Sequence, residues 1–251
     1  MSSASSEDFD TMDELSGRTA IHYAAANGDI ERIELLLAEE GVDVNARAAG
    51  DGRTALHLAS IHGQTEAVEL LLQCEGIDVN ARGADDNRTA LHLASLQGHT
   101  DVVELLLQCE GIDVNARGAE DNRTALHLAT LNGHVDVAKA LLEHEGIDVN
   151  ARGAEDNRTA LHLATLLGHL EIVKALLQNK GIDVNARGAG DDRTALHLAS
   201  LHGHLEIVES LLQSKGIDLD ARGAGDERTA LDLASLHGFT EIAESLQLIE
   251  A

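Results

Sequence analysis

The sequence contains no proline and no tryptophan, and aromatic residues make up only 1% of its 251 positions. Proteins contain about 5% proline on average, so the helix starts and loops of this chain must be set by Gly, Asp, Asn and Thr. The core must likewise be built from Leu, Val, Ile and Ala. Hydrophobic residues reach 43%, a share that favours a packed core and argues against a wholly disordered chain.

Basic residues are also scarce, because 18 Lys and Arg stand against 44 Asp and Glu and leave a formal net charge of −26. Such a polyanion is repelled by nucleic acid backbones and anionic membranes, so neither is expected as a partner. No apolar run approaches the roughly 18 residues of a membrane span, and the first residues lack the basic and apolar regions of a secretory signal. We therefore expect an intracellular, cytoplasmic protein. We also expect a monomer, because high net charge opposes self-association.

A threonine in the motif RTA recurs at a spacing of 35 residues. The motif places it at Thr19, Thr54, Thr89, Thr124, Thr159, Thr194 and Thr229. We predict seven repeats that form one domain over residues 14–251, with the first and last copies acting as caps. Residues 1–13 lie outside this period and are rich in Ser and acidic side chains, which predicts a disordered acidic tail.

The copy at 89–123 shows what each repeat contains. Thr89 is a good N-cap for a short helix of small and apolar residues, and Gly98 supplies the left-handed residue that ends it. A second helix begins near Asp101 and carries one apolar face. The stretch IDVNARGAEDNR that follows is rich in turn-forming residues and is expected to form an extended finger. Neither helix reaches the dozen or so residues needed for stability alone, so the repeats must stack on one another.

The motifs TALHLA, GH and GIDVNA resemble the signature of the ankyrin repeat family. The resemblance covers nearly the whole chain and implies an all-α solenoid of stacked helix-turn-helix units with hairpin-like fingers. The sequence departs from the family in having Ala90, Ala125 and Ala160 where proline is usual, and in a repeat two residues longer than the usual 33 or so. Asp232 and Asp220 replace the histidine and asparagine of the other copies, which is typical of a terminal capping repeat.

The histidines recur in two sets, one residue per repeat in each. The TALH set is His92, His127, His162 and His197, and the GH set is His99, His134, His169 and His204. A metal site needs several ligands that converge on one point, whereas stacked helices place equivalent residues about 10 Å apart. We therefore predict no metal. The resemblance implies instead that each imidazole bonds groups in its own turn and in the finger of the next repeat.

No motif for catalysis or cofactor binding is found. The sequence lacks a phosphate-binding glycine loop, a Gly-x-Ser-x-Gly elbow and an HExxH motif, so we expect neither an enzyme nor a cofactor. Cys74 and Cys109 occupy equivalent places in adjacent copies, too far apart for a disulfide, which fits a reducing compartment. The finger asparagines resemble those that asparaginyl hydroxylases modify, but the resemblance more simply implies turn asparagines that form hydrogen bonds. They are Asn80, Asn115, Asn150 and Asn185.

The resemblance implies that a partner binds at the finger tips and the exposed side of the inner helices, on a concave face. Two rows precede the inter-helix glycines, by two residues and by one. The first row is Ile61, Leu96, Leu131, Leu166, Leu201 and Leu236, and the second is His62, Gln97, Asn132, Leu167, His202 and His237. The finger arginines that border them are Arg88, Arg123, Arg158 and Arg193. Each group has a structural alternative: partial burial of the leucines, solvation of the histidines, and salt bridges from the arginines to Asp86, Glu120 or Asp121.

The copies are close to identical, since those at 89–123 and 124–158 differ at only eight of 35 positions. We predict a non-enzymatic scaffold that binds a partner protein or peptide on the concave face. The uniformity suggests a recently duplicated array, a consensus-like or engineered scaffold without a dedicated ligand, or a regular partner. A regulatory subunit whose catalytic part lies on a partner is a third possibility.

Overall fold

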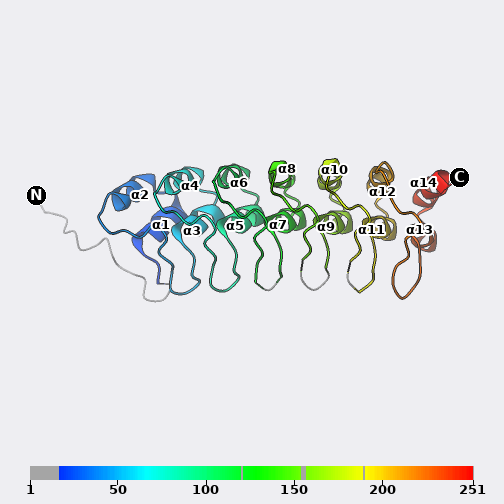
Figure 1. Ribbon diagram of the computed structural model, residues 1–251, viewed down its shortest axis with the longest axis horizontal. Helices are drawn as coiled ribbons and strands as arrows, with labels where there is room; N and C mark the ends of the chain where they lie inside the picture. Colours follow the sequence, from blue (N-terminus) through cyan, green and yellow to red (C-terminus); the bar gives the residue numbers. More distant parts are fainter. Residues whose placement is uncertain (1–16, 120, 154–156, 189, 251) are drawn as a thin grey trace, which may run out of the picture. The chain divides into compact units, whose positions relative to one another are not determined.

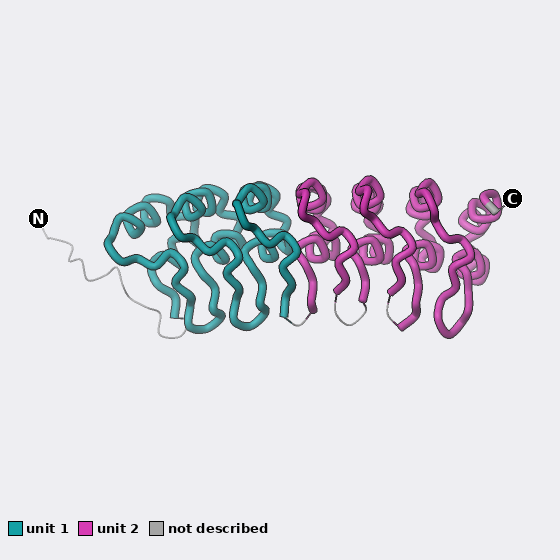
Figure 2. The backbone as a smooth tube through the Cα atoms, viewed as in Figure 1, with its two compact units in different colours: residues 1–119 teal, residues 120–251 magenta. Residues whose placement is uncertain are grey.

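The computed structural model describes residues 17–119, 121–153, 157–188 and 190–250. Within these ranges it contains fourteen helices in seven pairs and no strand, as the all-α prediction required. The chain divides into two compact units, residues 1–119 and 120–251 (Figure 2). The predicted tail at 1–13 lies outside the described residues, and the single repeat domain over 14–251 stays a prediction.

Each repeat contributes one inner helix next to the fingers and one outer helix on the opposite side (Figure 1). The first unit has inner helices α1 (Ala20–Asn27), α3 (Ala55–Ile61) and α5 (Ala90–Gln97), with outer helices α2 (Ile30–Leu37), α4 (Thr65–Leu72) and α6 (Thr100–Leu107). The second unit has inner helices α7 (Ala125–Leu131), α9 (Ala160–Leu167), α11 (Ala195–His202) and α13 (Ala230–His237). Its outer helices are α8 (Val135–Glu143), α10 (Leu170–Gln178), α12 (Leu205–Leu212) and α14 (Thr240–Glu250).

The helix ends follow the motifs that predicted them. Thr54 is the N-cap of α3 and forms a capping box with His57, the third residue of the helix. Gly98 adopts φ +81° and ends α5 as a left-handed C-cap. The outer helix α6 begins at Thr100, one residue earlier than expected, and Asp101 lies in its first turn.

The core is aliphatic, as the lack of aromatic residues required. Leu56, Leu58 and Leu71 are almost fully buried in the first unit, and small residues such as Ala59 and Ala67 are buried between them. The small side chains let the inner helix lie close to its neighbours. Each helix is too short to be stable alone, so this shared packing supplies most of its stability.

The fingers are hairpins that bond to themselves and to one another. In the first unit, the backbone N–H of Gly83 donates to Arg88 O within one finger (2.9 Å), and Ala84 N donates to Asp51 O in the preceding finger (2.8 Å). In the second unit, Ala224 N donates in the same way to Asp191 O (2.8 Å). The finger is therefore ordered by its neighbour as well as by its own turn.

The glycine between the two helices of a repeat meets two requirements. Gly63 adopts φ +68°, and a Cβ built on it would lie 2.6 Å from Nδ1 of His99 in the next repeat. Gly76 adopts φ +78° with nothing within 4 Å of such a Cβ. Substituting Gly76 would therefore cost only the strain of a left-handed backbone, whereas substituting Gly63 would also displace a neighbouring side chain.

We predict that Gly63→Ala destabilises the chain more than Gly76→Ala. The left-handed conformation costs each alanine about 1–2 kcal/mol, and only Gly63→Ala must also push the His99 ring from its place, which adds about 1 kcal/mol for a lost hydrogen bond. Urea unfolding of both variants measures the difference. Equal destabilisation would show that contact with the His99 ring does not constrain Gly63.

Candidate protein-interaction surface

The histidines of the TALH set are buried, as are His22 and His57 at the equivalent positions of the first two repeats, and they link each repeat to the next. His57 is 1% exposed, and its Nδ1 accepts the backbone N–H of Thr54 (3.1 Å) while lying 2.9 Å from the Thr54 hydroxyl. An N–H group can only donate, so Nδ1 carries no proton and Nε2 carries the ring's hydrogen. Nε2 then donates to Arg88 O in the next finger (3.0 Å). The same arrangement is formed by His22, His162 and His197.

His99, a member of the GH set, behaves differently from the prediction. Nε2 of His99 lies 3.2 Å from Ile61 O, so its ring bonds the preceding repeat rather than the next finger. Gln64, which stands at the equivalent place one repeat earlier, donates likewise to Ala26 O (3.2 Å). The reason is position: the residue follows the inter-helix glycine and lies over the glycine of the preceding repeat, Gly63 in the case of His99. The prediction that the His99 ring bonds the finger of the next repeat was therefore wrong.

The finger asparagines also join neighbouring repeats. Nδ2 of Asn150 donates to Gly181 O (2.7 Å), and Oδ1 of Asn150 accepts the N–H of Asp183 (2.8 Å). The pattern of one bond donated and one accepted repeats at Asn45, Asn80 and Asn185. These amides therefore have a structural role.

The cysteine and histidine side chains offer little for chemistry. Within the described part of the chain, no group of three or more His, Cys, Asp or Glu side chains could hold a metal ion. Cys74 and Cys109 are free thiols, and burial raises the pKa of each above its ordinary value. A raised pKa keeps the thiol protonated at neutral pH, which is unfavourable for a nucleophile.

The finger arginines form ion pairs with the neighbouring fingers. Arg53 pairs with Asp86 of the next repeat (3.3 Å), and Arg193 pairs with Asp226 (3.2 Å). Oδ1 of Asp86 also accepts the backbone N–H of Arg88 (3.1 Å), so one carboxylate fixes two fingers. Arg123 lies 3.9 Å from Asp121. The salt-bridge alternative therefore holds for Arg193 and Arg123, and neither Arg88 nor Arg158 is free of a partner.

The two rows on the inner helices differ in exposure. Ile61, Leu96, Leu131, Leu166 and Leu201 are half-buried, and Leu236 in the last repeat is 57% exposed. The row one residue closer to the glycine is exposed at every position, namely His62, Gln97, Asn132, Leu167, His202 and His237. The second row is therefore the more accessible to a partner. Leu167, at 45% exposure, is its most apolar member in an interior repeat.

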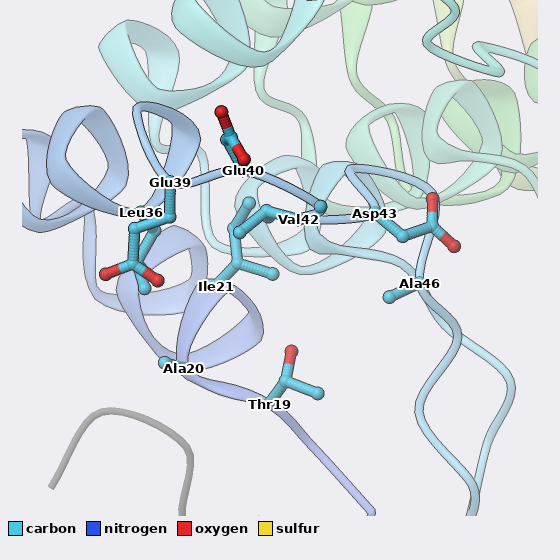
Figure 3. Close-up of a pocket in the computed structure, with 10 residues that line it drawn as sticks. Thr19, Ala20, Ile21, Leu36, Glu39, Glu40, Val42, Asp43 and Ala46 are labelled. Atoms are coloured by element: carbon cyan, nitrogen blue, oxygen red, sulfur yellow. The ribbon is translucent and has the colours of Figure 1, made fainter. Parts of the chain in front are cut away.

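A cavity of about 630 Å³ lies in the first repeat, where Ile21, Leu36 and Val42 line its apolar side. The carboxylates of Glu39, Glu40 and Asp43 stand around it (Figure 3). All of its charged residues are acidic, and none was singled out by the sequence. It lacks the mixture of acid, base and nucleophile that an active site needs.

A family model described as ankyrin repeats (3 copies) matches residues 3–83, 21–118, 80–153, 117–188 and 186–250. The chain belongs to the ankyrin repeat family. A crystal structure of the ankyrin repeat domain of Bcl-3, described as a unique member of the IkappaB protein family, is similar to it at 29% identity and a TM-score of 0.79. The similarity covers 91% of this chain and 99% of that one. A comparison with curated proteins gave no match.

Membership of the family settles the class of function at a coarse level. Ankyrin repeat domains typically mediate protein interactions and are generally non-catalytic, and no catalytic family was detected. None of the described helices is both long and apolar enough to cross a membrane.

We predict that this ankyrin repeat array loses stability as the pH falls below about 6.5. Burial lowers the pKa of His57, His162 and His197 below the ordinary value of 6.5. Between the folded and the ordinary pKa the unfolded chain binds more protons, so acidification favours unfolding. Urea midpoints measured from pH 7.5 to pH 5 should fall.

The variant His162→Gln provides the control, because its difference from the wild type isolates one imidazole from the general effect of net charge. It should be less stable than the wild type at pH 7.5, and the gap should narrow on acidification. A gap that stays constant would mean that the pKa of His162 is not lowered by folding.

Proposed function

We propose that this ankyrin repeat protein binds a partner protein or peptide through the inner-helix row in its second unit, centred on Leu167. Leu167 is 45% exposed and lies beside the half-buried Leu166 at the end of α9, which packs on α11. Burying a leucine against a partner contributes about 1.5–3 kcal/mol. An exposed leucine at a place where the family contacts ligands is the observation that carries the proposal.

The neighbouring side chains suit an apolar contact with a polar border. Burial lowers the pKa of His202 below its ordinary value, and the nearby His204, Arg158 and Arg193 lower it further. His202 is therefore neutral at physiological pH and can pack against an apolar group. The influence of Arg158 and Arg193 on its pKa also supports their place beside the row.

A scaffold without a dedicated ligand is the alternative that the near-identity of the repeats favours. A surface adapted to one irregular partner should vary most at its contact positions. The exposed row does vary, as His62, Gln97, Asn132, Leu167 and His202. This variation favours a dedicated partner.

We predict that Leu167→Glu abolishes capture of the partner and leaves the fold intact. The change removes apolar contact and adds a charge to an acidic protein, while an exposed position costs only about 0.5 kcal/mol of stability. Affinity capture from a cell lysate, with mass spectrometry and circular dichroism melts, measures both effects. Leu166 is a poorer probe because its half-burial would mix folding with binding.

The matched control is Leu35→Glu on the outer helix α2, where Leu35 is 63% exposed. It adds the same charge at a place away from the inner-helix row. Proteins held by the wild type and by Leu35→Glu but lost from Leu167→Glu support the proposal. If no protein depends on Leu167, the scaffold without a ligand is the better description.

A further inference from the structure

All four lysines of the chain lie in one region of the second unit. They are Lys139, Lys174, Lys180 and Lys215. Three of them line a groove of about 650 Å³ beside the outer helices α10 and α12. We propose that this groove, named here the lysine groove, is a second interaction surface that binds an acidic segment of a partner protein.

The charge of the lysine groove is entirely positive. Lys174 lies on α10, Lys180 in the turn after α10, and Lys215 in the turn after α12. The remaining lining residues are neutral, with Leu177 and Ile182 among the apolar ones. Three lysines and no carboxylate give the lining a formal charge of +3 in a chain whose net charge is −26.

The repeat period shows that this charge replaces the opposite one. Subtracting three periods, 105 residues, from the three lysines gives Glu69, Glu75 and Glu110, so the equivalent lining in the first unit carries −3. The apolar residues are retained, since Leu72 and Ile77 stand where the lysine groove has leucine and isoleucine. Of the eight other lining residues, five are the same in the first unit. A change of six charges between two such similar linings indicates a local purpose rather than the general pattern of the array.

The lysines are available to a partner. Among the described residues neither Lys180 nor Lys215 has an ion-pair partner. Lys174 pairs with Glu171 at 2.9 Å, but the two side chains are 48% and 58% exposed. Such an exposed pair contributes at most about 1 kcal/mol and can exchange for a carboxylate of the ligand.

An adjacent cavity marks the limit of the positive region. It is lined by Lys139, Lys174 and Lys180, but also by three glutamates, so its formal charge is zero. The glutamates are Glu143, Glu145 and Glu171. The excess of positive charge therefore lies on the side of α10 that faces α12.

The chemistry of the groove favours an acidic protein segment over other anions. Nucleic acids and anionic membranes extend well beyond the groove, so the negative charge of the whole protein would repel them. A short peptide segment stays close to the lysines, within the roughly 10 Å beyond which salt screens electrostatic interactions. Leu177 and Ile182, both half-buried, can contact apolar side chains between the carboxylates of the ligand. We therefore expect a segment that mixes Asp or Glu with aliphatic or aromatic residues.

The experiment selects peptides from a random display library on the full chain and measures their affinity as synthetic peptides. The test variant combines Lys174→Glu, Lys180→Glu and Lys215→Glu, which restores residues found at the equivalent positions of other repeats and should leave folding unchanged. We expect selected acidic peptides to bind the variant at least about tenfold more weakly, and wild-type binding to weaken as salt rises from about 50 to 300 mM.

Two further proteins complete the test. The combination Glu69→Lys, Glu75→Lys and Glu110→Lys places the same charges in the first unit and should add a second site for the same peptides. Leu167→Glu should leave peptide binding unchanged, which separates this proposal from the one for the inner-helix row. Three results would overturn the proposal: selection of peptides without acidic residues, unchanged affinity for the variant that combines Lys174→Glu, Lys180→Glu and Lys215→Glu, or lysine-dependent binding of an oligonucleotide or anionic vesicles in place of peptides.

Discussion

The structure within each unit depends on one interaction, in which a buried imidazole joins the start of its own helix to the finger of the next repeat. His57 accepts from the backbone of Thr54 on one side and donates to Arg88 O on the other. A helix of seven or eight residues has too few internal hydrogen bonds to be stable alone. The imidazole therefore makes the start of each inner helix conditional on the presence of a neighbour, which is the physical origin of the stack.

In the last repeat, two residues that link neighbouring repeats elsewhere are replaced by aspartate. Asp232 takes the place of the imidazole there and accepts the backbone N–H of Thr229 (2.9 Å). Asp220 stands where the other fingers have an asparagine that bonds the next loop. Each substitution keeps the local turn, as the bond from Asp220 N to Asp218 Oδ1 shows (3.1 Å). Among the described residues, neither carboxylate forms a hydrogen bond to another repeat.

The sequence predicted the parts of the structure that depend on local chemistry. The period follows from comparing the copies, whereas the Thr caps and the fingers follow from residues a few places apart, and all three were found. A glycine is the C-cap of α5, but α3 and α7 end one residue earlier, with His62 and Asn132 as C-caps. The repeat to which His99 forms its hydrogen bond depends on which neighbour its ring faces. The half-burial of Leu131 and Leu166 depends on how adjacent inner helices pack. Neither the bonding partner nor the burial can be predicted from the sequence of one repeat alone. The lysine groove could have been found by aligning the repeats, because Lys174 and Lys180 replace glutamates there.

The protonation of the buried imidazoles tests the central interaction most directly. Long-range ¹H–¹⁵N correlation spectra of the labelled protein at pH 7.5 distinguish the two ring nitrogens of each histidine. We expect His57, His162 and His197 to be neutral, with the proton on Nε2 and a bare Nδ1. A proton on Nδ1 in these residues, or a charged ring, would contradict the proposed link between the helix start and the next finger.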